Sequence, residues 1–254
     1  MWENRATKES TTTSSDIYGG RDPRAIPVYT YREAARCLNI PPSTLKAWAA
    51  GQSNFAAVLT PADAEQLSFF NLVEAWVVYD LRHRFHFSLQ SLRRLFDQLR
   101  RTFPGLTHPI AQADLSVLDA SAERGHVRKV GRAKLFAKHG QSSLLNLSKG
   151  DQTALETVLH DLLERVEKSP ASGIARLHPF ITRDRAPDAP KTIVVDPTVA
   201  FGKPVIDGTG IPTAAVVQLF NAGNSIAEIA EEYDRTPNEI EDAIRYESVR
   251  SKAA

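Results

Sequence analysis

The chain has 254 residues, a net charge of +1 and a hydrophobic content of 42%. This length accommodates two or three small domains, and no apolar run approaches the roughly 18–20 residues of a membrane span. A single cysteine, Cys37, excludes an internal disulfide framework, and the first residues lack the apolar stretch of a secretion signal. We therefore expect a cytoplasmic protein with no membrane partner, and Cys37 as a small core residue rather than a reactive thiol.

We expect a mainly α-helical chain with a small α/β middle region and two helix-turn-helix units, the N-terminal one winged. Residues 1–22 are polar and rich in Ser and Thr, which predicts a flexible tail. The sequence further predicts a helical domain over 23–103, a mixed α/β region over 104–182, a linker over 183–191 and a second helical domain over 192–254.

The first helix-turn-helix unit is marked by its caps and breaks. Thr30 and Glu33 have the spacing of a capping box, which opens a short helix. Residues 39–41 break that helix, and Pro42 suits the first turn of the next. The loop that begins at residues 51–54 is predicted to form a hairpin wing.

Two longer helices are predicted in the same domain. The first begins at Thr60 and carries a broad apolar stripe to about Arg84. Ser88 caps the second, whose inner face is apolar and whose outer face carries Arg93 and Arg94.

The middle region has a mixed pattern. Short extended runs are predicted at 134–137, 144–147, 173–177 and 192–195, and a helix is predicted at about 153–166.

The C-terminal domain is predicted to hold three helices. Thr213 caps the first and Ser225 caps the second, in which apolar residues are spaced for one buried face. Residues 234–236 make a turn, and Pro237 starts the last helix. The two final helices form the second helix-turn-helix unit.

The two units carry opposite charge. Residues 28–102 hold nine Arg or Lys against six Asp or Glu, a net +3, whereas residues 225–250 hold three against eight, a net −5. A surface that binds phosphates must be cationic, because neutralising phosphates and releasing counterions supplies most non-specific affinity. The first unit therefore suits DNA and the second suits a protein partner; the alternative for each is a solvated charged face.

The candidate DNA contacts are side chains that can reach base edges or phosphates. They lie on the two helices of the first helix-turn-helix unit and on the helix that Ser88 caps. They are Arg32, Ser43, Thr44 and Lys46, followed by Arg93 and Arg94. The alternative is a small helical packing unit without DNA contact. Reading two half-sites one helical turn apart predicts a homodimer.

Enzymatic motifs are not found. Pro204 follows Gly202-Lys203, where a phosphate-binding loop needs Ser or Thr. His83 and His86 are close enough to share a metal ion, but no cysteine or further acidic ligand clusters with them. We expect no enzyme, no cofactor and no metal site.

Two families resemble parts of the chain. The stretch 29–48, with its segment Ser43-Thr44-Leu45-Lys46, resembles the winged helix-turn-helix of MerR-like regulators. This resemblance implies that Lys46 contacts phosphate. The motifs in order from Val195-Asp196-Pro197 to Ile240-Glu241-Asp242-Ala243-Ile244, together with residues 67–75, are similar to VapB-like antitoxins.

The second resemblance implies an antitoxin of a type II toxin-antitoxin system. Such a protein neutralises a PIN-like RNase toxin by direct binding, and represses its own operon by binding the operator DNA as a homodimer or as a higher hetero-oligomer with the toxin. Because PIN-like active sites are acidic, the acidic C-terminal domain would either bind a basic RNA-entry surface of the toxin or use an arginine as the blocking group. The candidate toxin contacts are Glu231, Glu232, Arg235, Arg245 and Arg250. The alternative is a MerR-like transcriptional regulator without a toxin partner.

Overall fold

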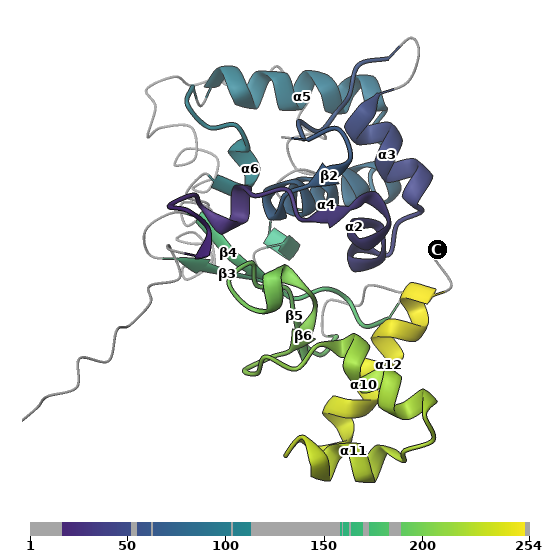
Figure 1. Cartoon of the computed structure of the whole chain (residues 1–254). Helices are drawn as coiled ribbons and strands as arrows, with labels where there is room; N and C mark the ends of the chain where they lie inside the picture. Colours follow the sequence, from purple (N-terminus) through teal and green to yellow (C-terminus); the bar gives the residue numbers. More distant parts are fainter. Residues whose placement is uncertain are drawn as a thin grey trace, which may run out of the picture.

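A computed structural model gives the structure of the chain (Figure 1). It describes residues 17–51, 55–61, 63–102, 104–112, 158, 160–162, 164–169, 173–182 and 189–251. The fold is mainly α-helical with short antiparallel strand pairs, which confirms the predicted fold class.

The helical elements, in chain order, are η1 (Pro23–Ala25), α2 (Tyr31–Leu38), α3 (Pro42–Ala50), α4 (Phe69–His83), α5 (Leu89–Thr102), α6 (Pro109–Gln112), η3 (Ala200–Gly202), α10 (Thr213–Asn221), α11 (Ile226–Glu232) and α12 (Pro237–Ser251). The strands are β1 (Tyr29–Thr30), β2 (Gln66–Leu67), β3 (Val166–Ser169), β4 (Gly173–Leu177), β5 (Ile193–Val194) and β6 (Val205–Ile206). They pair as β1–β2, β3–β4 and β5–β6, each antiparallel.

Helices α2 and α3 form at the positions predicted for the two helices of the first unit. The Thr30 amide donates to the Glu33 carboxylate at 2.9 Å, and the Glu33 amide donates to the Thr30 hydroxyl at 3.2 Å, so both halves of the capping box are present. Asn39 ends α2 in the left-handed conformation, with φ of 54°. Pro42 is the first residue of α3. Residues 52–54, where the wing was predicted to turn, lie outside the described residues.

The helix predicted to begin at Thr60 begins instead at Phe69, with Ser68 as its cap. The Asp63 carboxylate accepts hydrogen bonds from the amides two and three residues ahead, which fixes a turn there. Residues 66–67 then pair with residues 29–30 as β2 against β1. The prediction failed because this strand partner is distant in the sequence.

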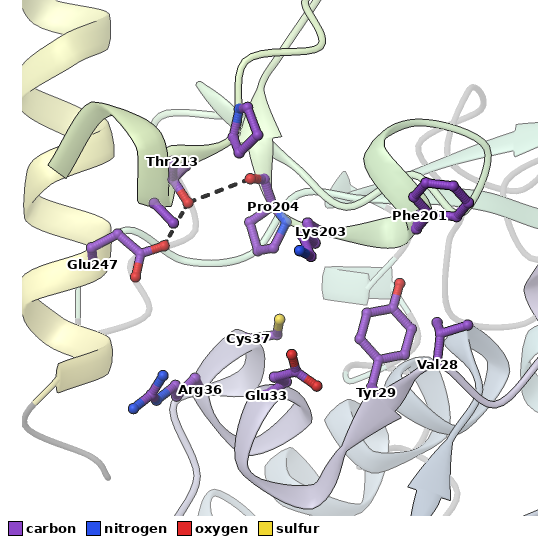
Figure 2. Close-up of a pocket in the computed structure, with 12 residues that line it drawn as sticks. Val28, Tyr29, Glu33, Arg36, Cys37, Phe201, Lys203, Pro204, Thr213 and Glu247 are labelled. Carbon is purple, nitrogen blue, oxygen red and sulfur yellow. Dashed lines mark hydrogen bonds between the residues drawn. The ribbon is translucent and has the colours of Figure 1, made fainter. Parts of the chain in front are cut away.

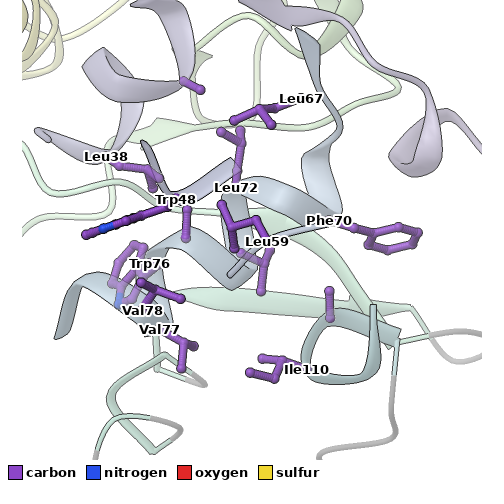
Figure 3. Packing of buried hydrophobic residues seen from close by; sticks show 14 of the residues in the cluster. Leu38, Trp48, Leu59, Leu67, Phe70, Leu72, Trp76, Val77, Val78 and Ile110 are labelled. Carbon is purple, nitrogen blue, oxygen red and sulfur yellow. The ribbon is translucent and has the colours of Figure 1, made fainter. Parts of the chain in front are cut away.

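Helix α4 is the centre of the main hydrophobic core, and twelve of its fifteen residues are buried. A helix that is apolar on nearly all sides belongs in the interior. Figure 3 shows Trp76, Leu72 and Val77 of α4 packed among Trp48 of α3 and Leu59. Burying a large apolar side chain contributes about 1.5–3 kcal/mol, so this cluster holds the first helix-turn-helix unit in place.

The middle region contains the β3–β4 hairpin. Strand β4 matches the extended run predicted at 173–177, and β5 lies within the run predicted at 192–195. The described residues of the predicted 153–166 helix are helical up to residue 164, but Val166 already belongs to β3. The runs predicted at 134–137 and 144–147 lie outside the described residues, as does most of the predicted linker.

Buried Arg165 joins the end of this helix to the segment after β4. Its guanidinium donates to the carbonyl oxygens of His178 at 3.1 Å and Pro179 at 3.0 Å, and stacks over the Phe180 ring. Burial lowers the pKa of Arg165.

The C-terminal helices α10, α11 and α12 surround a second, smaller core that includes Ile206, Val216, Ile229 and Ile240. Ser225 caps α11 as predicted, and Pro237 starts α12. None of the helices in the described part of the chain is long and apolar enough to cross a membrane.

The cap predicted at Thr213 is wrong. Thr213 is the first residue of α10 and Pro212 occupies the cap position. The Thr213 hydroxyl instead donates to the Glu247 carboxylate of α12 at 2.5 Å. A carboxylate is a strong acceptor, so the hydroxyl serves a contact between helices rather than the helix end.

Candidate functional site

The predicted DNA contacts on α2 and α3 face solvent. Arg32, Ser43 and Lys46 are exposed, and Thr44 is half-buried. Within the described residues, neither Arg32 nor Lys46 forms an ion pair. Their charges are therefore not neutralised by described neighbours.

Helix α5 uses its arginines in two ways. Arg94 is exposed, and no ion pair within the described residues involves it. Arg93 instead donates to the carbonyl oxygen of Ala56 and lies over the Phe55 ring, 5.4 Å from the ring centroid. Arg100 donates to the carbonyl oxygen of Val58 at 3.2 Å. Two arginines of α5 thus hold the loop that follows α3.

The same loop is bonded to α3 itself. The amides of Val58 and Leu59 donate to the carbonyl oxygen of Trp48, at 2.8 and 3.0 Å. The loop therefore links α3 to α5, and Lys46 and Arg94 are held on one connected unit. These loop contacts depend on residues far apart in the sequence, which is why periodicity alone suggested only an outward-facing row of arginines.

Residues 225–250, which carry the net charge of −5 and are called the acidic unit below, lie at the opposite end of the molecule from α5, with α11 farthest away (Figure 1). Two of its carboxylates cap its own helices. Glu228 accepts from the Ser225 amide at 2.7 Å, and Glu239 accepts from the Thr236 amide at 2.8 Å. These backbone hydrogen bonds lower the pKa of both carboxyls.

Two more carboxylates connect α12 to other elements. Asp242 accepts from the Thr192 hydroxyl at 2.7 Å, and Glu247 accepts from the Thr213 hydroxyl. Four of the eight acidic residues in this unit, namely Glu228, Glu239, Asp242 and Glu247, therefore form hydrogen bonds within the C-terminal segment 192–251. The charge count alone could not separate them from residues available to a partner.

Glu231 and Glu232 are exposed at the end of α11. The predicted toxin-contacting arginines are engaged within α12 and at its start: Arg235 lies 3.7 Å from Glu239, and Arg245 lies 2.6 Å from Glu241. Exposed pairs of this kind contribute about 0–1 kcal/mol, so a partner can exchange them at small cost. The side chain of Arg250 lies outside the described part of the structure.

A pocket of 320 Å³ separates α2 from the C-terminal domain (Figure 2). From the first domain Cys37, Arg36 and Glu33 line it, and from the C-terminal domain Lys203 and Glu247 are among the lining residues. Cys37 is 3% exposed, which agrees with its prediction as a core residue. Sequence reasoning missed this pocket because its two walls come from opposite ends of the chain.

Tyr29 and Gly202 connect the two walls beside the pocket. The Tyr29 hydroxyl donates to the carbonyl oxygen of Gly202 at 3.0 Å, and Tyr29 is 4% exposed. Burial raises the pKa of Tyr29 well above its ordinary value, which keeps the hydroxyl protonated as a donor. Gly202 has φ of +76°, and a Cβ there would lie 2.1 Å from the Tyr29 hydroxyl oxygen. Only glycine satisfies both the backbone conformation and the close approach.

Comparison with known proteins first assigns the C-terminal part. Residues 193–246, from β5 into α12, match a family model described as "Protein of unknown function (DUF433)".

One sequence match and one structural match, both from Mycobacterium tuberculosis, then cover most of the chain. The protein named "Putative antitoxin VapB45" is 27% identical over 242 residues, which cover 86% of this chain and 93% of that protein. The crystal structure of Rv2018 matches with a TM-score of 0.59 at 23% identity, covering 86% of this chain and 98% of the other. This structural match supports a shared fold.

Proposed function

We propose that the chain is an antitoxin of a type II toxin-antitoxin system, which neutralises a PIN-like RNase toxin by direct binding and represses its own operon by binding promoter DNA. The observation that carries this proposal is the separation of charge: exposed cations around α3 and α5, and exposed carboxylates on α11 at the far end of the molecule. Similarity over 86% of the chain to the protein named "Putative antitoxin VapB45" supports it.

In this proposal residues 23–103 form a MerR-like DNA-binding domain. Helix α3 enters the major groove with Ser43, Thr44 and Lys46 toward the DNA. Arg94, joined to α3 through the loop that Arg93 holds, contacts the phosphate backbone, and a dimer places two such helices on two half-sites.

The C-terminal domain, residues 192–254, is proposed to bind the toxin. Glu231 and Glu232 are placed to meet a basic RNA-entry surface. Arg245 is proposed to leave its own Glu241 and to pair with the acidic groups of the toxin's active site. The exposed pair with Glu241 contributes only about 0–1 kcal/mol, so Arg245 can leave it at small cost.

The test is co-expression with the protein encoded by the neighbouring gene. If that protein is a PIN-like RNase, its induction arrests growth, and co-expression of this chain restores growth while the two proteins copurify. Persistent growth arrest in cells that contain soluble chain would contradict the neutralisation proposal. Operator binding is measured separately on the promoter fragment.

The pocket beside α2 favours a second candidate function, a transcriptional regulator that responds to a small molecule without any toxin. A 320 Å³ pocket with charged walls lies directly behind the first helix of the DNA-binding unit. This candidate requires a metabolite that raises the melting temperature of the chain and changes its operator affinity. Growth rescue without any such metabolite supports the antitoxin instead.

A further inference from the structure

Three side chains meet where the β3–β4 hairpin adjoins the C-terminal domain. Glu167 lies on β3, His178 directly follows β4, and Asp207 directly follows β6. The imidazole nitrogen and one carboxylate oxygen from each acid lie within 4.8 Å of one another. These residue types can all bind a divalent transition metal.

The backbone fixes the protonation of the His178 ring. His178 is 3% exposed, and its Nδ1 atom lies 3.1 Å from the carbonyl oxygen of Lys191 and 3.2 Å from that of Ile193. Carbonyl oxygens only accept hydrogen bonds, so Nδ1 carries the proton. Metal-binding histidines are commonly oriented in this way, with the second nitrogen donating to a backbone carbonyl.

The other nitrogen of the ring faces a carboxylate. His178 Nε2 lies 3.2 Å from Glu167 Oε1. In the neutral ring with Nδ1 protonated, Nε2 presents a lone pair, and the carboxylate also presents lone pairs. The two atoms repel each other unless a cation or a second proton lies between them. A buried ring held against a carboxylate in this way is the observation that points to a ligand.

The separation of His178 Nε2 and Glu167 Oε1 suits zinc, and the Asp207 oxygen lies within 4.8 Å of both atoms. Bonds of about 2.0–2.1 Å in a tetrahedral site place neighbouring ligand atoms about 3.3 Å apart, close to the separation of His178 Nε2 and Glu167 Oε1. Glu167 is oriented through its second oxygen, 3.3 Å from Arg176 Nη1, and the Arg176 charge is shared with Asp196 at 2.7 Å. Asp207 is positioned by its amide, which donates to the Thr192 carbonyl oxygen at 2.8 Å.

We propose that Glu167, His178 and Asp207 bind a Zn²⁺ ion. The ion connects the β3–β4 hairpin to β6 and leaves a fourth coordination position open. The inference is independent of the antitoxin proposal, because it depends only on these three side chains. It also goes against the expectation of no metal site. The three ligands are far apart in the sequence and lack the spacing of a zinc motif, so no local pattern pointed to them. The competing arrangement is a doubly protonated His178 paired with Glu167, without metal.

The test uses the purified full-length chain, stripped with a chelator and titrated with ZnCl₂ in a calorimeter. We expect one equivalent to bind and to raise the melting temperature. Asp207→Asn and Glu167→Gln should each weaken zinc binding at least about 10-fold, since each keeps its shape but loses the charged ligand. Glu241→Gln, which removes an exposed carboxylate on α12, is the matched control and should bind zinc like the unaltered chain.

Two results would overturn the proposal. One is the absence of a stoichiometric zinc isotherm in the unaltered chain. That absence is the result expected if a doubly protonated His178 pairs with Glu167 without metal. The other is unchanged zinc affinity in both Asp207→Asn and Glu167→Gln. Asp207 is only half-buried, and asparagine differs from it by one heavy atom, so we expect Asp207→Asn to fold. The test therefore does not need a substitution of the buried His178.

Discussion

Replacing Gly202 by alanine should break the connection between β1, which carries Tyr29, and the C-terminal segment that carries Gly202. The new Cβ would lie 2.1 Å from the hydroxyl oxygen and 2.9 Å from the Cζ atom of Tyr29, so the buried ring must move by about 1 Å. Overpacking of this kind costs about 1–3 kcal/mol, and the left-handed backbone of a non-glycine residue costs about 1–2 kcal/mol. Loss of the Tyr29 hydrogen bond adds about 1 kcal/mol. We expect a total loss of about 3–6 kcal/mol in the free energy of unfolding.

Gly208 offers a matched control. Its φ is +70°, close to the +76° of Gly202, but a Cβ there meets nothing within 4 Å. Gly208→Ala should therefore cost only the conformational term of about 1–2 kcal/mol. Unfolding in urea, followed by the fluorescence of the buried Trp48 and Trp76, measures both variants.

A third variant separates the clash from general damage. Tyr29→Phe removes the hydroxyl, so the cost of Gly202→Ala should decrease in that background by about 1–2 kcal/mol, which is a measurable coupling energy. Equal costs for Gly202→Ala and Gly208→Ala, or no coupling to Tyr29, would refute the proposed contact.

Three further predictions concern the charged groups. Lys46→Ala should weaken operator binding and reduce the slope of log affinity against log salt by about 1, whereas Arg245→Ala should leave both unchanged; an unaltered slope in the Lys46 variant would remove that residue from the interface. Reversing the charge of Glu231 and Glu232 to lysine should abolish growth rescue in the toxin co-expression assay and leave operator binding intact; full rescue would exclude them as toxin contacts. Burial raises the pKa of Glu74, so this carboxyl favours the folded state below its unfolded pKa of about 4.3, and that contribution is lost as the pH rises through its folded pKa. The stability of the chain relative to its Glu74→Gln variant should therefore decrease in urea unfolding as the pH rises above the unfolded pKa of about 4.3, and a constant or increasing difference would contradict the assigned direction.

Local signals predicted the helix boundaries that local hydrogen bonds determine. Thr30 with Glu33 and Ser225 with Glu228 form capping boxes within three residues of one another, so the sequence contains both partners of each bond. Thr213 has the residue type of a cap, but its hydroxyl bonds to Glu247 of a different helix. A residue type alone does not distinguish these cases.

The positions of charged side chains were harder to predict. Arg93 and Arg94 are neighbours in sequence and identical in chemistry, yet one holds the loop at Ala56 and the other faces solvent. Their difference arises from where the loop returns to α5, which depends on the packing of the whole first domain. The same holds for the acidic unit, where tertiary contacts engage Asp242 but leave Glu231 exposed.

The contact between Tyr29 and Gly202 also limits how freely the two ends of such proteins can be recombined. A chimaera that carries this C-terminal segment on another N-terminal unit needs a side chain that fills the position of Tyr29 and donates to the Gly202 carbonyl oxygen, and it needs glycine at position 202. Conversely, a chain shortened before residue 196 would uncover Tyr29 and Cys37, which line its boundary with the C-terminal domain. The two ends of the chain can therefore diverge in sequence only in combinations that preserve this junction.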